Sequence, residues 1–432
     1  MNKPISTYRE ACSYLDDLQM HKIKLGLDAM RRTLAELGSP ETVCPAVHIA
    51  GTNGKGSVCS MLRTTATLAG YKTGMYTSPH LDSVRERFRI DDDYIGRDDF
   101  TRLMEKIRSS LGDRRITYFE CTTALAFLWF AENGCDLILL ETGMGGRLDA
   151  TNVVTPLLSV ITSISLDHEQ YLGDTIEQVA YEKAGIIKTG VPVIAGVDDP
   201  VAQEVIERAC AEREAPLQSR DVDFRMERGH GQPWTWKSAT KTAQLPTLDP
   251  HQPNGWQVDN ISLVVAAAHC LDGVGVTIRD EVLDRGIAAT RWPGRMELID
   301  TGRRYLLDGA HNRAGVDSLI RSLKNYQYEN LVVVWASMGD KSYAAMLNDI
   351  ANIADTLVLT RPDSERAAQT EELLDSLELT GAGVVTVCDT VEQAQIEAER
   401  AAGENDLIVV AGSLYLIGEF RAHLVGRVTG DG

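Results

Sequence analysis

The sequence has no apolar run long enough to cross a membrane, and its first residues include acidic side chains but no apolar segment of the kind that a signal peptide requires. Its eight cysteines are scattered and include no C-x-x-C pair, which indicates reduced, buried thiols and no disulfide framework. No internal repeat and no low-complexity tract is present. We therefore expect a globular protein of the cytoplasm.

Positive charge is scarce: 43 basic side chains stand against 62 acidic ones, which gives a formal net charge of −19. This balance argues against nucleic acid as the main partner. If the substrates are anions, local basic groups must hold them against the field of the whole protein. We expect small molecules as partners, no nucleic acid, no membrane, and a monomer.

A chain of 432 residues is too long for one ordinary core, so two domains are expected. Strand-like apolar runs alternate with helical patterns, which predicts a parallel α/β architecture in both domains. We place the first domain at residues 1–294 and a smaller one at 295–432. Between residues 217 and 256 the alternation weakens, and irregular loops or short antiparallel strands are expected. The expected strands are Ala46–Ala50, Gly74–Thr77, Leu137–Glu141, Leu158–Ile164, Val191–Ala195, Tyr305–Leu307, Leu331–Ala336, Thr356–Thr360, Val384–Val387 and Leu407–Ala411, and the expected helices include Val58–Ala69, Tyr118–Asn133, Thr175–Ile187, Pro200–Arg213 and Val258–Leu271.

A glycine-rich run, Gly51-Thr52-Asn53-Gly54-Lys55-Gly56-Ser57, stands between an expected strand and an expected helix, as a phosphate-binding loop requires. Its glycines let backbone N–H groups turn toward phosphate oxygens, and the helix N-terminus adds partial positive charge. Lys55 can reach the terminal phosphates and Ser57 can ligate Mg²⁺. The spacing departs from G-x-x-x-x-G-K-[ST], because Gly56 separates the lysine from the hydroxyl. A plain glycine-rich turn is the alternative, and the flanking elements favour nucleotide binding.

Two further strand ends carry polar side chains. Glu141 closes one expected strand and precedes a glycine-rich turn, and Asp167-His168 follows another. A carboxylate at the C-terminal edge of a parallel sheet can hold Mg²⁺, although a turn or helix-cap carboxylate is equally consistent for Glu141. At the second position either His168 or Asp167 could be the ligand. The acidic residues Asp91–Asp93 are interpreted as solvated loop surface.

Taken together, these motifs resemble the folylpolyglutamate synthase/dihydrofolate synthase family, a branch of the ATP-dependent Mur ligase superfamily. The resemblance runs from about Lys24 to Tyr415. It rests on GTNGKGS at 51–57, TSPHL at 77–81, ETGMGGRLDATN at 141–152, Asp167-His168, EKAGI at 182–186 and DGAHN at 308–312. One departure, Ser342 where many relatives have aspartate, concerns a peripheral contact and not the reaction class.

The resemblance implies roles for particular residues. It implies catalytic roles for Lys55, Lys183 and His168, with Lys183 at the position of a lysine that the family carbamylates; a surface lysine paired with Glu182 or Glu177 is the alternative. It implies an ATP site at Thr52, Asn53, Gly54, Lys55, Gly56, Ser57, Asn260, Arg295 and Asp308. The implied Mg²⁺ ligands are Ser78, Glu141 and His168, with Ser57 contributing. The implied substrate residues are Thr117, Tyr118, Phe119, Glu120, Leu148, Asp149 and Ala150 on the pterin side, with Lys22–Leu25 contributing, and His311 and Ser413 on the glutamate side.

The chemistry implied by the family is amide formation. ATP phosphorylates a carboxylate, and the amine of L-glutamate attacks the acyl phosphate to give the amide, ADP and phosphate. The acceptor would be 7,8-dihydropteroate, a reduced folate, or both, bound in a cleft between two domains that excludes water. Three alternatives stay open: a cell-wall ligase acting on a UDP-linked precursor, a nucleotide-binding regulator without ligase activity, and a small-molecule kinase.

Overall fold

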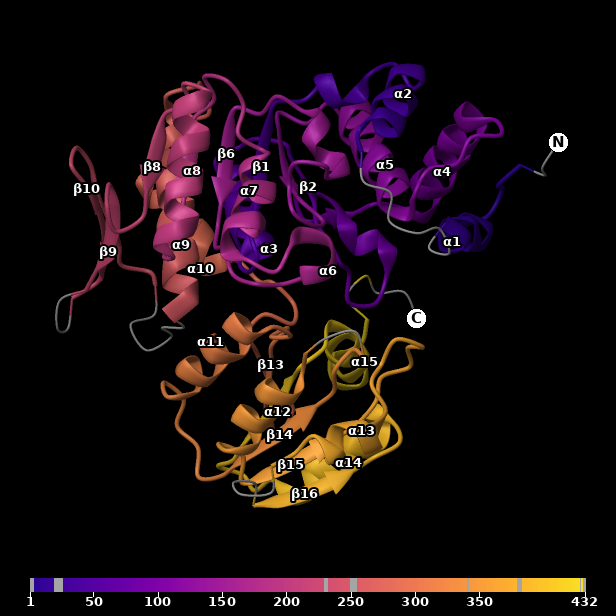
Figure 1. Cartoon of the computed structure of the whole chain (residues 1–432), viewed down its shortest axis with the longest axis vertical. Coiled ribbons are helices and arrows are strands. Elements are labelled where there is room, and N and C mark those ends of the chain that lie inside the picture. Colours follow the sequence, from indigo (N-terminus) through magenta and orange to yellow (C-terminus); the bar gives the residue numbers. More distant parts are fainter. Residues whose placement is uncertain are drawn as a thin grey trace. The chain divides into compact units, whose positions relative to one another are not determined.

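The computed structural model describes residues 4–18, 26–228, 232–248, 255–339, 342–378, 383–427 and 429. The chain forms two compact units (Figure 1). The first contains Met1–Pro79, Val84–Pro250 and Gln257–Thr290, and the second contains mainly Arg291–Gly432. The division therefore falls after Thr290, whereas the sequence places it after Gly294. The short segment His80–Ser83 belongs to the second unit, which the sequence does not predict.

The first unit is built on an eight-stranded sheet with the order β4-β3-β2-β5-β1-β6-β7-β8. β1 is buried along its whole length and pairs in parallel with β5 on one side and β6 on the other. The chain leaves β1 toward β2 and later returns to β6, so the strand order reverses at β1. Ligands bind at such a switch point, beyond the carboxyl ends of the strands. The strands are β1 (Ala46–Ala50), β2 (Thr73–Tyr76), β3 (Phe88–Ile90), β4 (Asp93–Tyr94), β5 (Leu137–Glu141), β6 (Leu158–Ile161), β7 (Val193–Ala195) and β8 (Leu217–Ser219).

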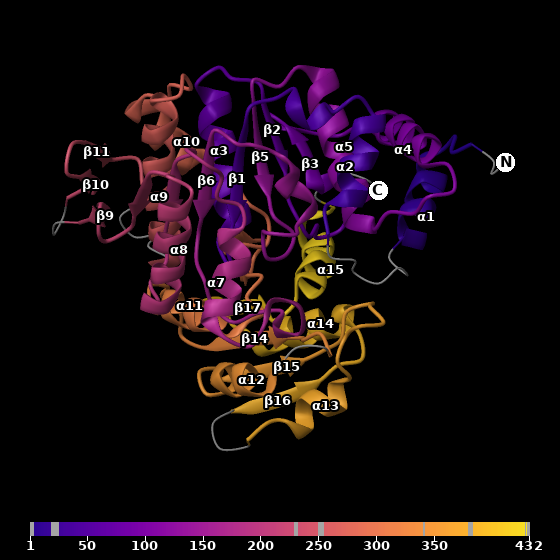
Figure 2. The ribbon, with the colours of Figure 1, turned by 45° about the horizontal axis from the view of Figure 1, so that its top comes forward.

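Helices cover both faces of this sheet (Figure 2). Apolar side chains of α1, α2, α4 and α5 form one core with β2 and β5, and those of α7 and α8 form another with β6 and β7. α10 packs against α3. The helices are α1 (Tyr8–Asp17), α2 (Asp28–Glu36), α3 (Lys55–Leu68), α4 (Arg97–Leu111), α5 (Tyr118–Asn133), α6 (Glu169–Leu172), α7 (Ile176–Ala184), α8 (Pro200–Glu212), α9 (Gly255–Asp272) and α10 (Asp280–Ala289), with single 3₁₀ turns η2 (Pro40–Thr42), η3 (Val84–Arg87) and η4 (Ala150–Val153).

Short antiparallel strands lie where the alternation of the sequence weakens. β9 (Phe224–Glu227), β10 (Trp234–Ser238) and β11 (Thr242–Leu245) form a three-stranded antiparallel sheet. The buried indole of Trp236 anchors this sheet, because its Nε1 donates to the Ser262 carbonyl on α9 at 3.1 Å. The expectation of short antiparallel strands in this segment is therefore confirmed for the residues described.

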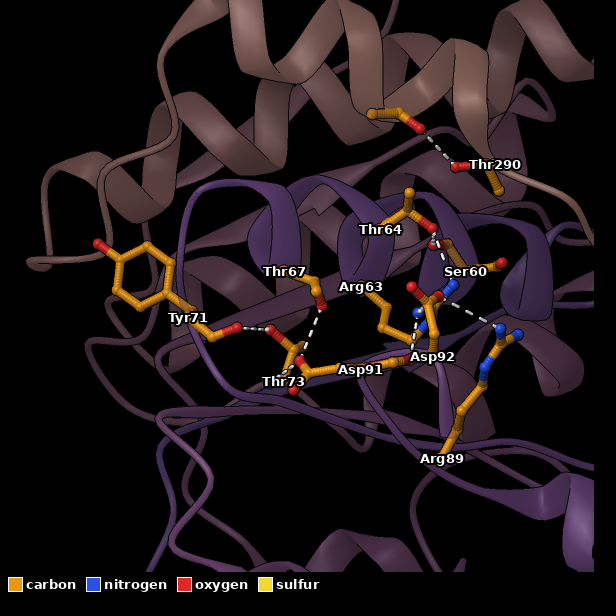
Figure 3. Close-up of polar contacts among 11 residues, drawn as sticks. Ser60, Arg63, Thr64, Thr67, Tyr71, Thr73, Arg89, Asp91, Asp92 and Thr290 are labelled. Atoms are coloured by element: carbon orange, nitrogen blue, oxygen red, sulfur yellow. Dashed lines mark hydrogen bonds and ion pairs between the residues drawn. The ribbon is translucent and has the colours of Figure 1, made fainter. Parts of the chain in front are cut away.

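The hairpin β3–β4, which the sequence does not predict, is tied to α3 by polar contacts (Figure 3). The buried Arg63 guanidinium on α3 donates to the Asp91 carbonyl and lies 3.0 Å from an Asp92 carboxylate oxygen. The Asp91 carboxylate accepts from the Thr73 amide at 2.9 Å and the Thr67 hydroxyl at 3.0 Å. Asp92 and Asp93 are exposed as expected, but Asp91 is a structural acceptor.

The second unit has a six-stranded sheet with the order β12-β13-β17-β14-β15-β16, parallel except for the β12–β13 pair. α11 and α12 pack on one face, and α14 and α15 pack on the other. The elements are β12 (Glu297–Asp300), β13 (Arg304–Leu307), α11 (Arg313–Leu323), β14 (Leu331–Trp335), α12 (Ala344–Ala351), β15 (Thr356–Leu359), α13 (Thr370–Asp375), β16 (Val384–Val387), α14 (Val391–Ala401), β17 (Leu407–Ala411) and α15 (Leu414–Val425).

The predicted α/β fold is thus confirmed in both units. All ten expected strands and all five expected helices are present, with ends that differ by at most three residues. All eight cysteines are free, and six are buried. Among the described helices, none combines the length and the apolarity needed to cross a bilayer.

The close crossing of α3 and α10 gives a testable prediction. A Cβ added at Gly286 on α10 would lie 2.5 Å from Cγ2 and 2.8 Å from Cα of Thr65 on α3. We expect Gly286→Ala to lower the free energy of unfolding by roughly 1–3 kcal/mol, because a packed core resists added volume. Gly96→Ala, where a Cβ would meet nothing within 4 Å, is the control for urea denaturation. Unchanged stability of Gly286→Ala would contradict this helix crossing.

Candidate active site

The glycine-rich run forms a tight turn from the end of β1 into α3. Gly51 has φ +154° and Gly54 has φ +86°, conformations that side chains rarely adopt. A Cβ at Gly51 would overlap the Thr162 hydroxyl, and one at Gly54 would overlap the Asn260 carboxamide oxygen on α9. Asn260, expected near the nucleotide, therefore packs on the loop itself, with a buried Nδ2 that has no partner in the described part of the chain.

The segment after β6 holds this loop by hydrogen bonds. The Thr52 amide donates to the Ser163 carbonyl at 2.8 Å, and the Asn53 amide donates to the Ser163 hydroxyl at 3.0 Å. The Thr162 hydroxyl donates to the Asn53 carbonyl at 2.6 Å, and the Thr52 hydroxyl donates to the Ser165 carbonyl at 3.0 Å. Thr162, Ser163 and Ser165 are functional-site residues that the sequence reasoning missed. The available signal was a run of hydroxyl residues directly after a strand.

Two lysines meet at the carbonyl oxygen of Gly51. Lys55 Nζ donates to it at 3.0 Å and to the Thr52 carbonyl at 3.1 Å, and Lys183 Nζ donates to it at 2.8 Å. Burial, together with the nearby positive charge of Lys55, lowers the pKa of Lys183 to about 7. A buried amine with this pKa is substantially neutral near pH 7, and a neutral amine is a nucleophile.

The alternative reading of Lys183 as a surface lysine is wrong. Only 3% of the residue is exposed. Glu182 is bound instead by Arg147, whose Nη2 lies 2.7 Å from its carboxylate, and Glu177 faces Arg208 at 3.8 Å. Lys183 is therefore part of the wall of the phosphate loop.

Glu141 ends β5 beside the loop. Its side chain is buried, and one carboxylate oxygen accepts from the Ser78 amide at 3.0 Å. The next residue, Thr142, donates its amide to the Ile49 carbonyl on β1, which fixes the strand end. Since β2 and β5 are neighbours, the fold brings Ser78 and Glu141 together as the resemblance implies.

His168 lies at the start of α6 with φ +53°, and its side chain is 43% exposed. Asp167 accepts from the His168 amide at 2.8 Å and is the more buried of the two, with 10% of its side chain exposed. In the parts of the chain that the structure describes, no group of three or more His, Cys, Asp and Glu side chains could hold a metal. The implied set contains only two such residues, with serine hydroxyls as the others, so it stays a prediction.

The glycine-rich turn after Glu141 packs against the C-terminal end of α7. A Cβ at Gly146 would lie 2.9 Å from the Glu182 carbonyl, and one at Gly185 would overlap the backbone of Arg147. The Asn152 carboxamide donates to the carbonyls of Arg147 and Gly185 at 3.0 Å each. The motifs ETGMGGRLDATN and EKAGI therefore form one interlocked structure.

Asp149 organises the same turn from inside. One of its carboxylate oxygens accepts from the amides of Gly143 and Met144 at 2.8 and 3.0 Å. The other accepts from the Thr151 amide at 3.1 Å and the Thr151 hydroxyl at 2.5 Å. A carboxylate has about four acceptor positions, and all are occupied here. A substrate bond to this side chain would have to displace one of these donors.

The residues expected on the pterin side begin α5. Thr117 and Glu120 form a capping box, in which each side chain bonds to the backbone amide of the other. The Phe119 ring lies against Gly143, where an added Cβ would come within 2.6 Å, and 5.8 Å from the Tyr76 ring. Phe119 is partly buried and packs against the core, and its stacking on a pterin ring stays a prediction.

The other expected residues on that side are placed as follows. The Arg87 guanidinium lies 5.2 Å above the Tyr118 ring. Leu148 is partly exposed and Ala150 is buried. Lys22–Leu25 lies outside the described residues.

In the second unit, Arg295 and Asp308 lie close to one another. Asp308 follows β13 and accepts from the amides of Met296 and Ala310 at 2.9 and 3.0 Å. Burial raises the pKa of Asp308, and the Arg295 charge opposes that shift. A Cβ at Gly309 would overlap the Arg295 guanidinium. Because two backbone donors occupy only part of the carboxylate, Asp308 can still accept from a further hydroxyl.

The two residues expected on the glutamate side also belong to this unit. His311 Nδ1 lies 2.7 Å from the Gly309 carbonyl. Ser413 caps α15, with its hydroxyl 3.2 Å from the Tyr415 amide and 3.4 Å from Met338 Sδ. Both side chains lie beyond the carboxyl ends of parallel strands, β13 and β17. Asp340 and Lys341, which precede the departure at Ser342, are outside the described residues.

Family models match both units: the Mur ligase middle domain over residues 49–215, and the Mur ligase glutamate ligase domain over residues 294–414. With the phosphate loop and the two lysines, these matches define an ATP-dependent ligase of the Mur type. The dihydrofolate synthase/folylpolyglutamate synthase of Bacillus subtilis is 35% identical over 97% of this chain and 99% of its own length. The chain belongs to the dihydrofolate synthase/folylpolyglutamate synthase family and is an acid–amino-acid ligase.

Solved structures support the same assignment. Escherichia coli FolC in complex with DHPP and ADP has a TM-score of 0.88 and 30% identity, covering 98% of this chain and 99% of its own. A bifunctional folylpolyglutamate synthase/dihydrofolate synthase with Mn, AMPPNP and L-glutamate bound has a TM-score of 0.86 and 29% identity, covering 97% and 98%. Among the alternatives, a small-molecule kinase does not account for the glutamate ligase domain.

The pKa of Lys183 gives a prediction about stability. Below about pH 7 the amine is protonated in both the folded and the unfolded state, and burial of its charge opposes folding fully. Above that pH the folded state loses the proton, while the unfolded state keeps it up to about pH 10.4. The unfolding free energy contributed by this group should therefore rise with pH across that window. Lys183→Met should flatten the rise in urea denaturation measured in CO₂-depleted buffer, and Lys241→Met, which replaces an exposed lysine, is the control. An unchanged pH profile in Lys183→Met would contradict the depressed pKa.

Proposed function

We propose that this chain joins the amino group of L-glutamate to the carboxyl group of 7,8-dihydropteroate and to the γ-carboxyl group of reduced folates. The observation that carries the proposal is the phosphate loop with Lys55 and Lys183 at Gly51. It stands in a chain that is similar over nearly its whole length to enzymes named for both reactions. A UDP-linked cell-wall precursor is the competing acceptor.

The proposed reaction has two steps. A carboxylate oxygen of the acceptor attacks the γ-phosphorus of ATP, the bond to the β-phosphate oxygen breaks, and ADP leaves. The amine of L-glutamate then attacks the carbonyl carbon of the acyl phosphate, loses a proton, and displaces phosphate. Neither step needs a side-chain nucleophile, so catalysis rests on positioning and on the neutralisation of charge.

Residues of the loop would perform both tasks. Thr52 to Ser57 would bind the phosphates of ATP. The Thr52 and Asn53 amides already donate to Ser163, so the amides of Gly54 to Ser57, at the start of α3, would meet the phosphate oxygens, which the N-terminus of the helix stabilises. The Lys55 ammonium now donates to two loop carbonyls and would turn to the terminal phosphates. Glu141, His168, Ser78 and Ser57 would hold Mg²⁺. When bound, Mg²⁺ would supply positive charge that neutralises the phosphate oxygens.

Lys183 is proposed to be carbamylated. A neutral amine attacks CO₂, and its pKa of about 7 supplies the neutral form at physiological pH. The carbamate would convert a cation beside Lys55 into an anion, which removes the repulsion between the two lysines. A ¹³C signal from the intact protein in ¹³C-bicarbonate that is missing in Lys183→Met would support this; its presence in both would contradict it.

We infer that both units are needed for turnover by a monomer. The first unit supplies the phosphate loop, Asn260 and the acceptor residues Thr117–Glu120 and Leu148–Ala150. The second supplies Arg295 and Asp308 for the nucleotide and His311 and Ser413 for glutamate. The first unit expressed alone should form no product, and sedimentation velocity of the whole chain should show one copy.

We expect Lys55→Ala to lower kcat by about 10²–10³, because it removes roughly 3–4 kcal/mol of transition-state stabilisation. Lys55→Arg keeps the charge and should retain more of the rate. ATP turnover by both variants at saturating substrates is the measurement. Near-normal turnover in Lys55→Ala would refute the phosphate-loop assignment.

We expect Glu141→Gln and His168→Ala to raise the Mg²⁺ concentration needed for half-maximal activity, since each removes a ligand. Glu177→Gln changes an exposed carboxylate outside the site and is the matched control. Activity is measured as a function of Mg²⁺ concentration at fixed ATP. If a variant keeps the wild-type dependence of activity on Mg²⁺ concentration, the residue that it replaces is not a metal ligand.

Mass analysis of products tests the acceptor. The purified chain is given ATP, Mg²⁺ and L-glutamate with dihydropteroate, tetrahydrofolate or a UDP-muramoyl precursor in separate reactions. We expect dihydrofolate from the first, glutamyl-extended folate from the second and no product from the third. Product from tetrahydrofolate alone would reduce the function to folylpolyglutamate synthesis, and product from the third would overturn the proposal.

A further inference from the structure

A chain of three buried polar side chains runs beneath the glycine-rich turn. His48 lies in the middle of β1 with no exposed surface, and its Nε2 is 2.8 Å from the Thr151 hydroxyl. The Thr151 hydroxyl in turn lies 2.5 Å from an Asp149 carboxylate oxygen. All three residues are buried. None of the motif-based expectations assigns a role to His48 or Thr151.

The direction of these hydrogen bonds follows from counting protons around an ionised Asp149, whose pKa is raised by burial while the hydrogen bonds that it accepts oppose that shift. Asp149 faces three backbone amides, from Gly143, Met144 and Thr151, and an amide can only donate. An ionised carboxylate satisfies all three, and the Thr151 hydroxyl then donates its single proton to it. That hydroxyl has no second proton for His48. The remaining bond forms only if His48 Nε2 carries a hydrogen and donates it.

The surroundings of His48 agree with this direction. Burial, together with the positive charge of Lys188, lowers the pKa of His48 to about 3, so the ring is neutral. A neutral ring has one N–H, and the chain places it on Nε2. Nδ1 is buried without a partner in the described residues, as expected for the nitrogen that lacks the hydrogen.

We propose that His48 and Thr151 are positioning residues for the acceptor site. His48 Nε2–H donates to the Thr151 hydroxyl, and that hydroxyl donates to the Asp149 carboxylate. The carboxylate in turn accepts from the backbone amides of Gly143 and Met144 and holds them in place. Gly143 lies against Phe119, so the same contacts fix the part of the glycine-rich turn that would line the proposed acceptor site. This inference rests on the proposed acceptor site. The loop with Lys55 is held separately, by Thr162, Ser163 and Ser165.

Steady-state kinetics tests the proposal. Thr151→Val removes the hydroxyl at nearly constant shape, and we expect the KM for dihydropteroate to rise roughly tenfold, as for loss of one hydrogen bond to a charged group, with the KM for ATP within about twofold of wild type. Thr151→Ser restores the hydroxyl and should recover most of the affinity. Thr33→Val is the matched control, because the Thr33 hydroxyl is buried and bonds only within α2. Equal rises in both KM values would overturn the proposal.

A double-mutant cycle tests whether His48 acts through Thr151. His48→Gln keeps a donor on a chain of similar reach, and His48→Met does not. We expect His48→Met to raise the KM for dihydropteroate more than His48→Gln does. In the Thr151→Val background, we expect His48→Met to add less than about twofold. Effects that multiply in the double variant would overturn the chain.

A spectroscopic readout is independent of the acceptor. The ¹⁵N chemical shifts of imidazole distinguish the two neutral tautomers, and we expect hydrogen on Nε2 of His48 in the wild type. Hydrogen on Nδ1 would overturn the chain, since it requires the opposite direction and a protonated Asp149. Phe119→Ala tests the acceptor site on its own: if it leaves the KM for dihydropteroate unchanged while the Nε2 tautomer is observed, the proposed site fails and the hydrogen-bond chain stands.

Discussion

The carbonyl oxygen of Gly51 accepts from two lysines, and much of the site follows from that one convergence. Lys55 and Lys183 come from different helices, and their ammonium groups are held at 3.0 and 2.8 Å from the same atom. Burial and the positive charge of Lys55 both disfavour the charged form of Lys183 and lower its pKa. The pocket therefore favours either a neutral Lys183 or the arrival of an anion. In a chain of net charge −19, the two lysines bring basic groups together beside the phosphate loop.

The parts of the site that could be predicted are those encoded by contiguous residues. A buried strand that is apolar except for His48, followed by glycines and a helix, gives the phosphate loop, since strand burial and positive φ are local requirements. The order of residues along the chain does not show which strands are neighbours in the sheet. The contacts of Thr162 and Ser163 with the loop arise because β6 pairs with β1, and that pairing depends on the whole strand order.

Two sets of residues expected on the pterin side also have a structural role in their own turns. Thr117 and Glu120 have the spacing of a capping box, and their polar atoms satisfy the first turn of α5. Asp149 stands in a motif implied to bind substrate, yet its carboxylate is filled by its own turn. In both cases the side chain stabilises the backbone around the site. A direct contact with substrate would then come from backbone groups, or the substrate would have to displace one of these hydrogen-bond donors. For Lys183, the charged residues beside it in the sequence are consistent with a surface position, whereas the structure shows that the lysine is buried.

The contact between Gly54 and Asn260 has a consequence for how the chain is made. The carboxamide that packs on the phosphate loop lies more than 200 residues downstream of it, and Gly286, which packs on α3, lies later still. During synthesis, the central strands and the loop emerge well before α9 and α10. Until those helices arrive, one side of α3 lacks its cover and Gly54 lacks its neighbour, and contacts of such long sequence separation form slowly. A nascent chain that has only just completed β8 thus has the contacts of the loop with Thr162 and Ser163 but still lacks those with Asn260 and α10.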